Sequence, residues 1–280
     1  MQSKPKWLRV PYYDEKESAF VSEMLAELRL NTVCEEAACP NRSECYSNKT
    51  ATFLILGKVC TRKCSFCNVT DGIPSPVDKD EPQRVAKAVK KLNLSYAVIT
   101  SVTRDDLPDG GSNHFGNVIS AIRKITPSTK IEVLIPDLGG DFDSVKTVAH
   151  ASPDVISHNI ETVPSLYEQV RPGADYKRSL SLIERVRDIN PNIRTKSGIM
   201  LGLGESHDEV LSAFDDLREV GCEILTIGQY LSPSKNHHPV NEYIPPEIFE
   251  QYAEVAEKKG FSHVASAPFV RSSYHAHLAL

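Results

Sequence analysis

The chain has 280 residues, of which 40% are hydrophobic and 25% charged, so it can bury an ordinary core as one enzyme domain. Its formal net charge of −5 gives no electrostatic reason to bind nucleic acid. The first residues lack an apolar signal region and no apolar run approaches the length of a membrane span, so we expect a cytoplasmic protein without a membrane partner. Seven cysteines, six of them in two tight groups, indicate metal binding rather than a disulfide scaffold.

The N-terminal segment begins with a predicted helix over residues 15–30. Within it Phe20, Met24, Leu25 and Leu28 recur at helical spacing. We therefore expect one face of this helix to pack on the main body of the protein.

The first cysteine group is Cys34, Cys39 and Cys45, with the spacing Cys-x4-Cys-x5-Cys. Iron–sulfur clusters usually take four cysteine ligands, so three close cysteines suit a cluster that draws its fourth ligand from elsewhere in the chain. Zinc or disulfides fit less well, because the number of cysteines is odd and a second group follows closely.

The second group is Cys60, Cys64 and Cys67, with the spacing Cys-x3-Cys-x2-Cys, and it follows an apolar run over residues 52–56. Three thiolates leave one iron of a four-iron cube without a protein ligand, and a small chelating molecule can occupy that iron. The alternative is a zinc site, but zinc prefers four closed ligands, often as two separated pairs, and only one Cys-x2-Cys pair is present here.

From residue 50 onwards, β-rich apolar runs alternate with helical patterns. The predicted strands cover residues 51–56, 96–102, 130–135, 154–160, 194–201 and 223–230, and the predicted helices cover residues 81–94, 115–125, 141–150, 177–189, 207–220 and 245–259. Six alternations predict an α/β fold with a parallel sheet, curled into a partial (β/α)6 TIM-like barrel. We divide the chain into an N-terminal extension (1–50), the barrel (51–265) and a C-terminal tail (266–280), and expect the two extensions to carry the auxiliary cluster.

Polar residues at the predicted strand ends are candidates for ligand binding. The loop 103–111 contains carboxylates and exposed glycine backbone that suit a polar ligand. The alternative is an ordinary solvated turn, since Asp-Gly-Gly is a common turn sequence. His237 and His238 are adjacent in a loop, and we expect them to be solvated and without a role in metal binding.

Four further candidates follow the later strands. Asn159 and Glu161 share one face and suit a ribose or an amino group, or else cap the following helix. The Arg171 guanidinium is suited to bind a ligand carboxylate through two hydrogen bonds. The alternative is that Arg171 lies on the surface without a role in binding. Lys196 lies in the fifth predicted strand.

Two levels of family resemblance follow from these motifs. The second cysteine group, with Phe66 before its last cysteine, resembles the signature of the radical S-adenosylmethionine (SAM) superfamily. The ordered set of both cysteine groups, with Arg271-Ser272-Ser273-Tyr274 near the C-terminus, resembles the lipoyl synthase family over essentially the whole chain. Similar intervening stretches are Thr103-Arg-Asp-Asp, His158-Asn-Ile-Glu-Thr and Val170-Arg-Pro-Gly-Ala.

The resemblance implies two [4Fe–4S] clusters. One would bind SAM at Cys60, Cys64 and Cys67, and the auxiliary one would take Cys34, Cys39 and Cys45 with a tail serine. We favour Ser273 as that ligand, with Ser272 as the alternative, and expect Arg271 to stabilise the serine alkoxide or the charge of the cluster. For SAM contacts, the positions implied are Phe66, Asn159, Glu161, Arg171 and Lys196.

The implied activity is insertion of two sulfur atoms at C6 and C8 of an octanoyl group on a protein lysine, with one SAM used per sulfur and the auxiliary cluster as sulfur source. The implied partners are octanoylated lipoyl domains of 2-oxoacid dehydrogenase E2 subunits, the glycine-cleavage H protein and a low-potential electron donor. Two alternatives are another radical SAM sulfur-inserting enzyme, such as one similar to biotin synthase, and a non-enzymatic iron–sulfur or zinc protein.

Overall fold

The computed structural model describes residues 4–9 and 15–280. Its strands are β1 (Asn31–Thr32), β2 (Thr52–Ile55), β3 (Val59–Cys60), β4 (Thr70–Asp71), β5 (Tyr96–Ser101), β6 (Lys130–Leu134), β7 (Val155–Ser157), β8 (Arg194–Leu201), β9 (Ile224–Gln229) and β10 (His263–Ser266). Its α-helices are α1 (Glu15–Glu27), α2 (Val33–Glu36), α3 (Arg42–Ser47), α4 (Glu81–Lys91), α5 (Ser112–Ile125), α6 (Phe142–His150), α7 (Tyr167–Val170), α8 (Tyr176–Ile189), α9 (His207–Glu219) and α10 (Pro246–Lys258). Four short 3-10 helices are η1 (Lys6–Leu8), η2 (Leu138–Gly140), η3 (Pro164–Leu166) and η4 (Ala276–Ala279).

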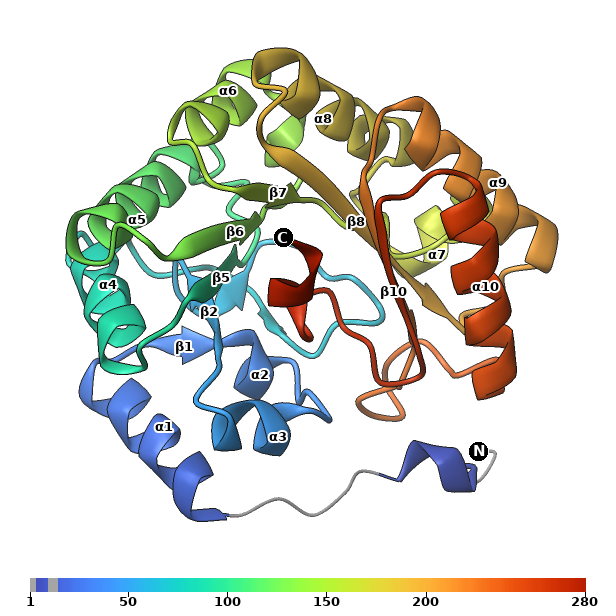
Figure 1. Ribbon diagram of the computed structural model, residues 1–280, viewed down its shortest axis with the longest axis horizontal. Coiled ribbons are helices and arrows are strands. Elements are labelled where there is room, and N and C mark those ends of the chain that lie inside the picture. The colour runs from blue at the N-terminus through green and yellow to red at the C-terminus, as the bar shows by residue number, and fades with distance from the viewer. Residues whose placement is uncertain (1–3, 10–14) are drawn as a thin grey trace.

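The main sheet is a curled, mostly parallel sheet with the strand order β1-β2-β5-β6-β7-β8-β9-β10. Each of the six predicted strands is present, and neighbours from β2 to β10 pair in parallel, whereas β1 pairs with β2 in the antiparallel direction. The order is linear, with β1 and β10 at its two ends, so the sheet curls without closing (Figure 1). The predicted partial barrel is therefore confirmed in outline.

The prediction of six strands omits β10, which pairs along the whole of its length with β9. Its four residues, His263–Ser266, are all partly buried and include a histidine and a serine. Such a short edge strand lacks the continuous apolar run that marks a central parallel strand, and for this reason the sequence pattern did not reveal it.

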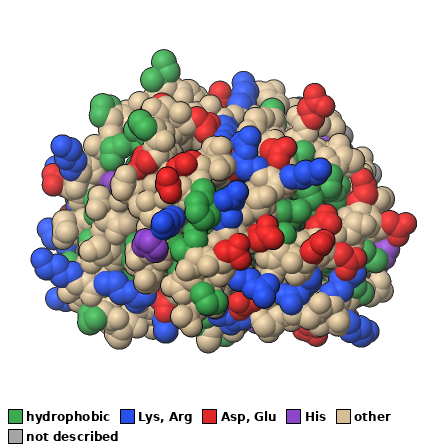
Figure 2. Space-filling model, turned by 90° about the horizontal axis from the view of Figure 1, so that it is seen from above, with side chains coloured by type: hydrophobic (Ala, Val, Ile, Leu, Met, Phe, Trp, Pro, Cys, Tyr) green, Lys and Arg blue, Asp and Glu red, His purple; other side chains and the backbone are tan. Residues whose placement is uncertain are grey.

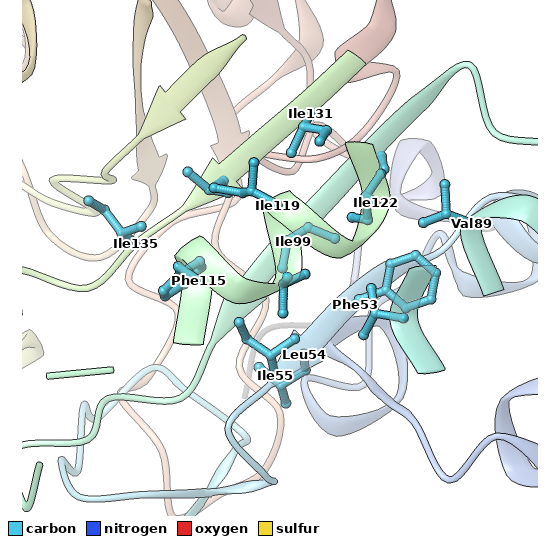
Figure 3. Packing of buried hydrophobic residues seen from close by; sticks show 14 of the residues in the cluster. Phe53, Leu54, Ile55, Val89, Ile99, Phe115, Ile119, Ile122, Ile131 and Ile135 are labelled. Carbon is cyan, nitrogen blue, oxygen red and sulfur yellow. The ribbon is translucent and has the colours of Figure 1, made fainter. Parts of the chain in front are cut away.

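The helices cover the outer face of the sheet, and a hydrophobic core lies between the two layers (Figure 1). In Figure 3, Phe115, Ile119 and Ile122 of α5 lie over Ile99 of β5 and Ile131 of β6, and all five side chains are buried. Full burial of each such side chain contributes about 1.5–3 kcal/mol. Because the helices cover the outer face of the sheet, the side chains on the other face of each strand line the interior of the curled sheet.

Helix α1 packs on the body largely through the predicted face. Met24 and Leu25 are buried, Leu28 packs against the core, and Val21 is buried as well, whereas Phe20 is 39% exposed and was wrongly assigned to the packed face. The Phe20 ring instead lies beneath the Lys49 ammonium, 5.9 Å from its centroid.

The C-terminal tail lies inside the curve of the sheet (Figure 1). It enters past Gly228 of β9, where a Cβ would lie only 2.2 Å from the Val270 carbonyl oxygen, so a larger residue would clash with the tail. At its end, Ala276 packs against Tyr96 and Val98 of β5. The tail is thus an internal part of the barrel.

The outer surface carries acidic and basic side chains interspersed on the face seen in Figure 2. Within residues 4–9 and 15–280, no helix has both the length and the apolar character needed to cross a bilayer.

Candidate functional site

A cavity of about 990 Å³ lies among the strand ends, the N-terminal segment and the tail, and both cysteine groups line it. The cysteines are Cys34, Cys39, Cys45, Cys60, Cys64 and Cys67, and each has a free thiol. The wall at the carboxyl ends of the parallel strands includes residues 102–103, 135–136, 158–159, Gly228 and Tyr230. The sequence analysis expects chemistry at this end of a parallel barrel, and the cavity opens there and extends along the inner face to residues 92–96 at the start of β5.

The loop that carries Cys60, Cys64 and Cys67 begins where β2 ends. Leu56 adopts a left-handed conformation (φ 67°), and its backbone N–H donates to the buried Glu81 carboxylate at 2.8 Å. The Leu56 carbonyl accepts a hydrogen bond from the buried Arg104 guanidinium at 3.1 Å. Two buried charged groups therefore fix the direction in which the cysteine loop leaves the sheet, at a backbone conformation that few residues adopt unaided.

Arg62, within the cysteine motif, connects this loop to two other strand ends. Its guanidinium donates to both oxygens of Asp105, at 2.8 Å each, and forms an ion pair with Asp137 at 2.7 Å. Asp137 is buried and also pairs with Arg178 at 3.2 Å. Burial, the largest single influence, acts to raise the pKa of Asp137, but the hydrogen bond and positive charge of Arg62, with smaller effects from His158 and the Gly139 N–H, lower it overall.

The loop is also held from the β9 side, by residues to which the sequence analysis assigned no role. The His237 Nε2 lies 3.1 Å from the Cys67 carbonyl oxygen. His238 is buried, and its backbone N–H donates to the Ser65 carbonyl at 2.8 Å. The expectation that both histidines are solvated is therefore wrong. About 170 residues separate His237 from Cys67, so no local pattern could have revealed the contact.

The first cysteine group sits on two short helices. Thr32 caps α2 by accepting from the Glu35 N–H at 3.3 Å, which places Cys34 in the first turn. Cys45 lies in α3, and the tail is bound to the same helix because the Tyr274 hydroxyl donates to Glu44 at 2.9 Å. The tail serines and the first cysteine group thus line the same cavity.

The two tail serines have different surroundings. The Ser272 hydroxyl donates to Asn159 Oδ1 at 3.1 Å, whereas Ser273, which also lines the cavity, has no hydrogen bond to any residue that the structure describes. Ser273 is thus the serine whose hydroxyl is available to a ligand.

Arg271 precedes these serines and is partly buried. Its guanidinium donates to the carbonyl oxygens of Val270 at 2.7 Å and Pro268 at 3.4 Å, and within the described ranges no carboxylate forms an ion pair with it. Burial lowers the pKa of Arg271, while Cys39 and Glu161 favour its charged form. A buried guanidinium without a carboxylate suits a cavity that receives a negatively charged group.

Burial also raises the pKa of several cysteine thiols. It raises the pKa of Cys34 to about 11, and the pKa values of Cys45 and Cys67 to about 12 each, with further increases from neighbouring cysteines. The thiols are therefore protonated at neutral pH, and binding iron at these positions would release protons.

Three of the predicted SAM contacts come together. Asn159 Nδ2 donates to Glu161 Oε1 at 3.0 Å, and Glu161 has a left-handed backbone (φ 66°). Burial raises the pKa of Glu161, while Arg171 and Asn159 act in the opposite direction. Arg171 is partly buried, its Nη1 donates to the carbonyl oxygens of Asn159 and Ile160 at 3.0 Å each, and its Nε is buried without a partner among the described residues. Asn159, Glu161 and Arg171 all line the cavity, so this polar group lies where a ligand can reach it.

Phe66 also lines the cavity and packs against the cluster of Val170, Leu203 and Tyr230. It thereby ties the cysteine loop to the ends of α7 and β9.

Lys196, in contrast, does not line the cavity. Its ammonium lies 2.8 Å from Glu132 Oε1, both side chains are almost fully buried, and the Tyr96 hydroxyl donates to the same carboxylate at 2.6 Å. Lys196 lies near the start of β8, next to Ser157 and Ile224, whereas the loop of Cys60, Cys64 and Cys67 follows the carboxyl end of β2. We therefore withdraw it from the SAM contacts.

The loop 103–111 was expected to present carboxylates to a ligand, and this expectation is not met. Asp105 binds Arg62, Asp106 binds Arg104, and Asp109 accepts from the backbone N–H groups of Gly111 and Asn113 at the start of α5. These carboxylates hold the fold around the cavity and are not free for a substrate.

Each cysteine group supplies three thiols, the number that a four-iron cluster with one further ligand requires. Within residues 4–9 and 15–280, no three His, Cys, Asp or Glu side chains converge as ligands of a single ion do. Arg171 beside Cys64 and Arg271 beside Cys39 supply positive charge for anionic clusters.

Comparison with known proteins agrees with this site. The family model of the radical SAM superfamily matches residues 54–217, which include the second cysteine group. A lipoyl synthase from Caldicellulosiruptor saccharolyticus is 58% identical over 271 residues, covering 97% of this chain and 95% of the relative. A lipoyl synthase from Geobacter metallireducens is 56% identical over 273 residues, covering 98% and 96% of the two chains.

Solved structures support the fold. Methylornithine synthase matches with a TM-score of 0.57 at 13% identity, covering 90% of this chain and 79% of that one. A maturase of the [FeFe]-hydrogenase matches with a TM-score of 0.59 at 13% identity, covering 90% and 68%. Identity this low bears on the fold alone, whereas the two relatives above extend over nearly the full length. The resemblance expected from the motifs is confirmed, and the chain belongs to the lipoyl synthase family of the radical SAM superfamily.

Proposed function

We propose that the chain inserts two sulfur atoms, at C6 and C8, into an octanoyl group carried on a lysine of a partner protein. The observation that carries this proposal is the shared cavity, because two three-cysteine groups and the tail serine all line one space of about 990 Å³. A reaction that joins a carbon radical to sulfur requires its two reactive centres to face the same substrate, protected from water.

We assign ligands to two [4Fe–4S] clusters from the family resemblance, and the shared cavity supports the assignment. Cys60, Cys64 and Cys67 would hold the cluster that binds SAM. The auxiliary cluster would take Cys34, Cys39 and Cys45, with Ser273 as the fourth ligand because its hydroxyl is free while that of Ser272 is engaged. When bound, the first cluster supplies the electron that cleaves SAM to a 5′-deoxyadenosyl radical, and the auxiliary cluster supplies the sulfur.

The chain's own residues position the reactants. We assign Arg171 to the SAM carboxylate, since it lines the cavity and its guanidinium interacts electrostatically with Cys64 and Glu161. Asn159 and Glu161 suit the amino group or ribose hydroxyls of SAM, and Phe66 suits its apolar edge. Arg271 would stabilise the serine alkoxide or the negative charge of the auxiliary cluster.

The alkyl chain requires an apolar part of the same cavity. Leu54, Val98 and Leu134 line it on the neighbouring strands β2, β5 and β6, and Met200 lines it on β8. A flexible chain held against these side chains would present C6 and C8 to both cysteine groups in turn.

The proposal includes partners and location. Octanoylated lipoyl domains of 2-oxoacid dehydrogenase E2 subunits and the glycine-cleavage H protein would bring the substrate, a low-potential donor would supply electrons, and two SAM molecules would be used for each lipoyl group. The seven free thiols suit the reducing cytoplasm.

The test is anaerobic reconstitution with iron and sulfide, followed by mass spectrometry of an octanoyl-lysyl peptide incubated with SAM and a reductant. We expect about eight irons per chain, from two four-iron clusters, and a product that has gained two sulfur atoms. SAM cleavage without sulfur gain would retain a radical enzyme but overturn the substrate, and zinc in place of iron would return the chain to the non-enzymatic alternative.

Two cysteine variants separate the roles of the two groups. Replacing Cys60, Cys64 and Cys67 together by alanine should abolish SAM cleavage. Replacing Cys34, Cys39 and Cys45 should preserve SAM cleavage and stop sulfur insertion. Lipoyl product from the second variant would contradict the role assigned to the auxiliary cluster.

A further inference from the structure

A single hydrogen bond connects the tail with the predicted SAM contacts. The Ser272 hydroxyl donates to Asn159 Oδ1 at 3.1 Å, although the two residues are 113 positions apart. Asn159 lies just beyond the end of β7, and its Nδ2 donates to Glu161 at 3.0 Å. Both ends of the Asn159 amide are thus occupied, one by the tail and one by a predicted SAM contact.

This arrangement makes the orientation of Asn159 depend on the tail. The amide packs closely against β8, because a Cβ on Gly198 would lie only 3.0 Å from Asn159 Oδ1. Without Ser272, the Oδ1 atom would lose its donor, and nothing else that the structure describes donates to it. A partly buried amide without its hydrogen bond is free to adopt other orientations.

The same short segment reaches the first cysteine group. Arg271, one residue before Ser272, is influenced electrostatically by Cys39 on one side and by Glu161 on the other. Ser273, one residue after, is the proposed iron ligand. These three consecutive residues therefore reach both cysteine groups' shared cavity and the predicted SAM contacts.

We propose that Ser272 couples SAM binding to the presence of the auxiliary cluster. This inference rests on the proposed function of the site. With Ser273 bound to iron, the tail is seated and Ser272 orients Asn159 toward SAM. When the cluster is absent or consumed, residues 271–273 can shift between the tail contacts at Phe269 and Tyr274, so that Asn159 loses its donor and SAM binds less tightly. SAM cleavage is then slower at SAM concentrations below saturation, and is preserved at saturating SAM.

The hydrogen bond from Ser272 to Asn159 sets the expected size of the change in SAM affinity. A neutral hydrogen bond of ordinary strength corresponds to a change in SAM affinity of about 3- to 10-fold. Linkage requires the same factor in the other direction, so that SAM should slow the loss of the auxiliary cluster.

The test is a thermodynamic cycle on SAM affinity, measured anaerobically by equilibrium dialysis without a reductant so that SAM is not cleaved. The four proteins are the reconstituted wild type, the variant with Cys34, Cys39 and Cys45 replaced by alanine, Ser272→Ala, and the combination. We expect loss of the auxiliary cluster to weaken SAM binding about 3- to 10-fold in the wild-type background and to have no effect in the Ser272→Ala background. Equal weakening in both backgrounds, or none in the wild type, would overturn the proposal.

Control variants separate this role from a structural one. Ser272→Thr retains a hydroxyl and should restore the coupling. Ser266→Ala removes a serine hydroxyl that donates to the Phe249 carbonyl at 2.7 Å, away from Asn159, and should leave the coupling intact. If the triple cysteine variant does not fold, Ser273→Ala replaces it, because that substitution also releases the tail from iron.

Iron content supplies an independent readout. Ser272→Ala should keep about eight irons per chain, since Ser273 remains available as the ligand. Loss of four irons would instead identify Ser272 as the ligand and overturn its coupling role. SAM affinity can be measured whether or not sulfur is inserted, so failure of this inference is distinguishable from failure of the proposed function.

Discussion

Single residues determine how the barrel interior responds to pH. His158 is fully buried beside the cavity, with Nδ1 2.8 Å from the Ile135 carbonyl oxygen and Nε2 3.0 Å from the Ser179 hydroxyl. Burial lowers the pKa of His158 to about 4, from 6.5 for the free side chain. The folded protein therefore holds the neutral ring, and the unfolded chain binds a proton more readily between these values.

From this pKa shift we predict a loss of stability in acid. Because the folded pKa is depressed, the stabilising contribution is present above pH 6.5 and is lost as the pH falls toward 4. Between pH 7 and pH 5.5 the free energy of unfolding should fall by about 1 kcal/mol more in the wild type than in His158→Gln. Urea unfolding at the two pH values measures this difference, and identical pH dependence in both proteins would contradict the assignment.

Lys196 and Glu132 form a buried ion pair whose loss we expect to be costly. Lys196→Met leaves the Glu132 carboxylate without its cation, which should destabilise the protein by about 3–5 kcal/mol. Adding Glu132→Gln should recover much of that loss, because the amide oxygen can still accept from the Tyr96 hydroxyl. Lys130→Ala is the matched control, since its ion pair with Asp154 is exposed and should cost less than about 1 kcal/mol. Urea unfolding of each variant measures its loss of stability. If Lys196→Met lowers the free energy of unfolding no more than Lys130→Ala does, the prediction is wrong.

At the scale of elements, the position of the C-terminal tail requires that residue 228 of β9 has no side chain. Gly228→Ala would put a methyl group 2.2 Å from the Val270 carbonyl oxygen, so the tail must shift. We predict that this variant loses the auxiliary cluster and retains about four of eight irons per chain.

Gly116→Ala on α5 is the control for Gly228→Ala. A Cβ there meets only Ala151 at 3.9 Å, and alanine favours a helix by up to about 1 kcal/mol over glycine. Its iron content should equal that of the wild type. Eight irons in Gly228→Ala would show that the tail can be seated without this space.

The cysteine loop depends on the charge of Asp137, which pairs with Arg62 and Arg178. In a background that lacks Cys34, Cys39 and Cys45, Asp137→Asn should release the remaining iron to a chelator several-fold faster, because Arg62 is left with Asp105 alone. Asp78→Asn is the control, since its pair with Arg84 lies on the surface. Equal release rates in the two variants would indicate that Asp137 does not hold the loop.

These elements also explain what the sequence could predict. The cysteine spacing and the six central strands are local patterns, and both were recognised. The contacts that hold the loop, such as Arg62 with Asp137 or His237 with Cys67, join residues far apart in the chain and leave no periodic signal. Lys196 was misassigned because a polar residue in a strand sequence does not reveal which end of the barrel it occupies.

At the scale of the whole molecule, one cavity brings both cysteine groups together. The N-terminal segment supplies one group and the loop after β2 supplies the other, and the tail lies inside the curve of the sheet (Figure 1). The tail and the N-terminal segment are bound together by the Asn41 amide, which donates to the Phe269 carbonyl at 2.7 Å. Both the N-terminal segment and the tail thus line the cavity at the first cysteine group.

The central claim is that the auxiliary site is the source of sulfur, and isotopic labelling tests it most directly. The protein is reconstituted with heavy-isotope sulfide, freed of unbound sulfide, and allowed a single turnover with an octanoyl-lysyl peptide, SAM and a reductant. We predict that both sulfur atoms of the product carry the label, even with ordinary sulfide in the solution. A product with unlabelled sulfur would show that the sulfur comes from elsewhere and would contradict the account.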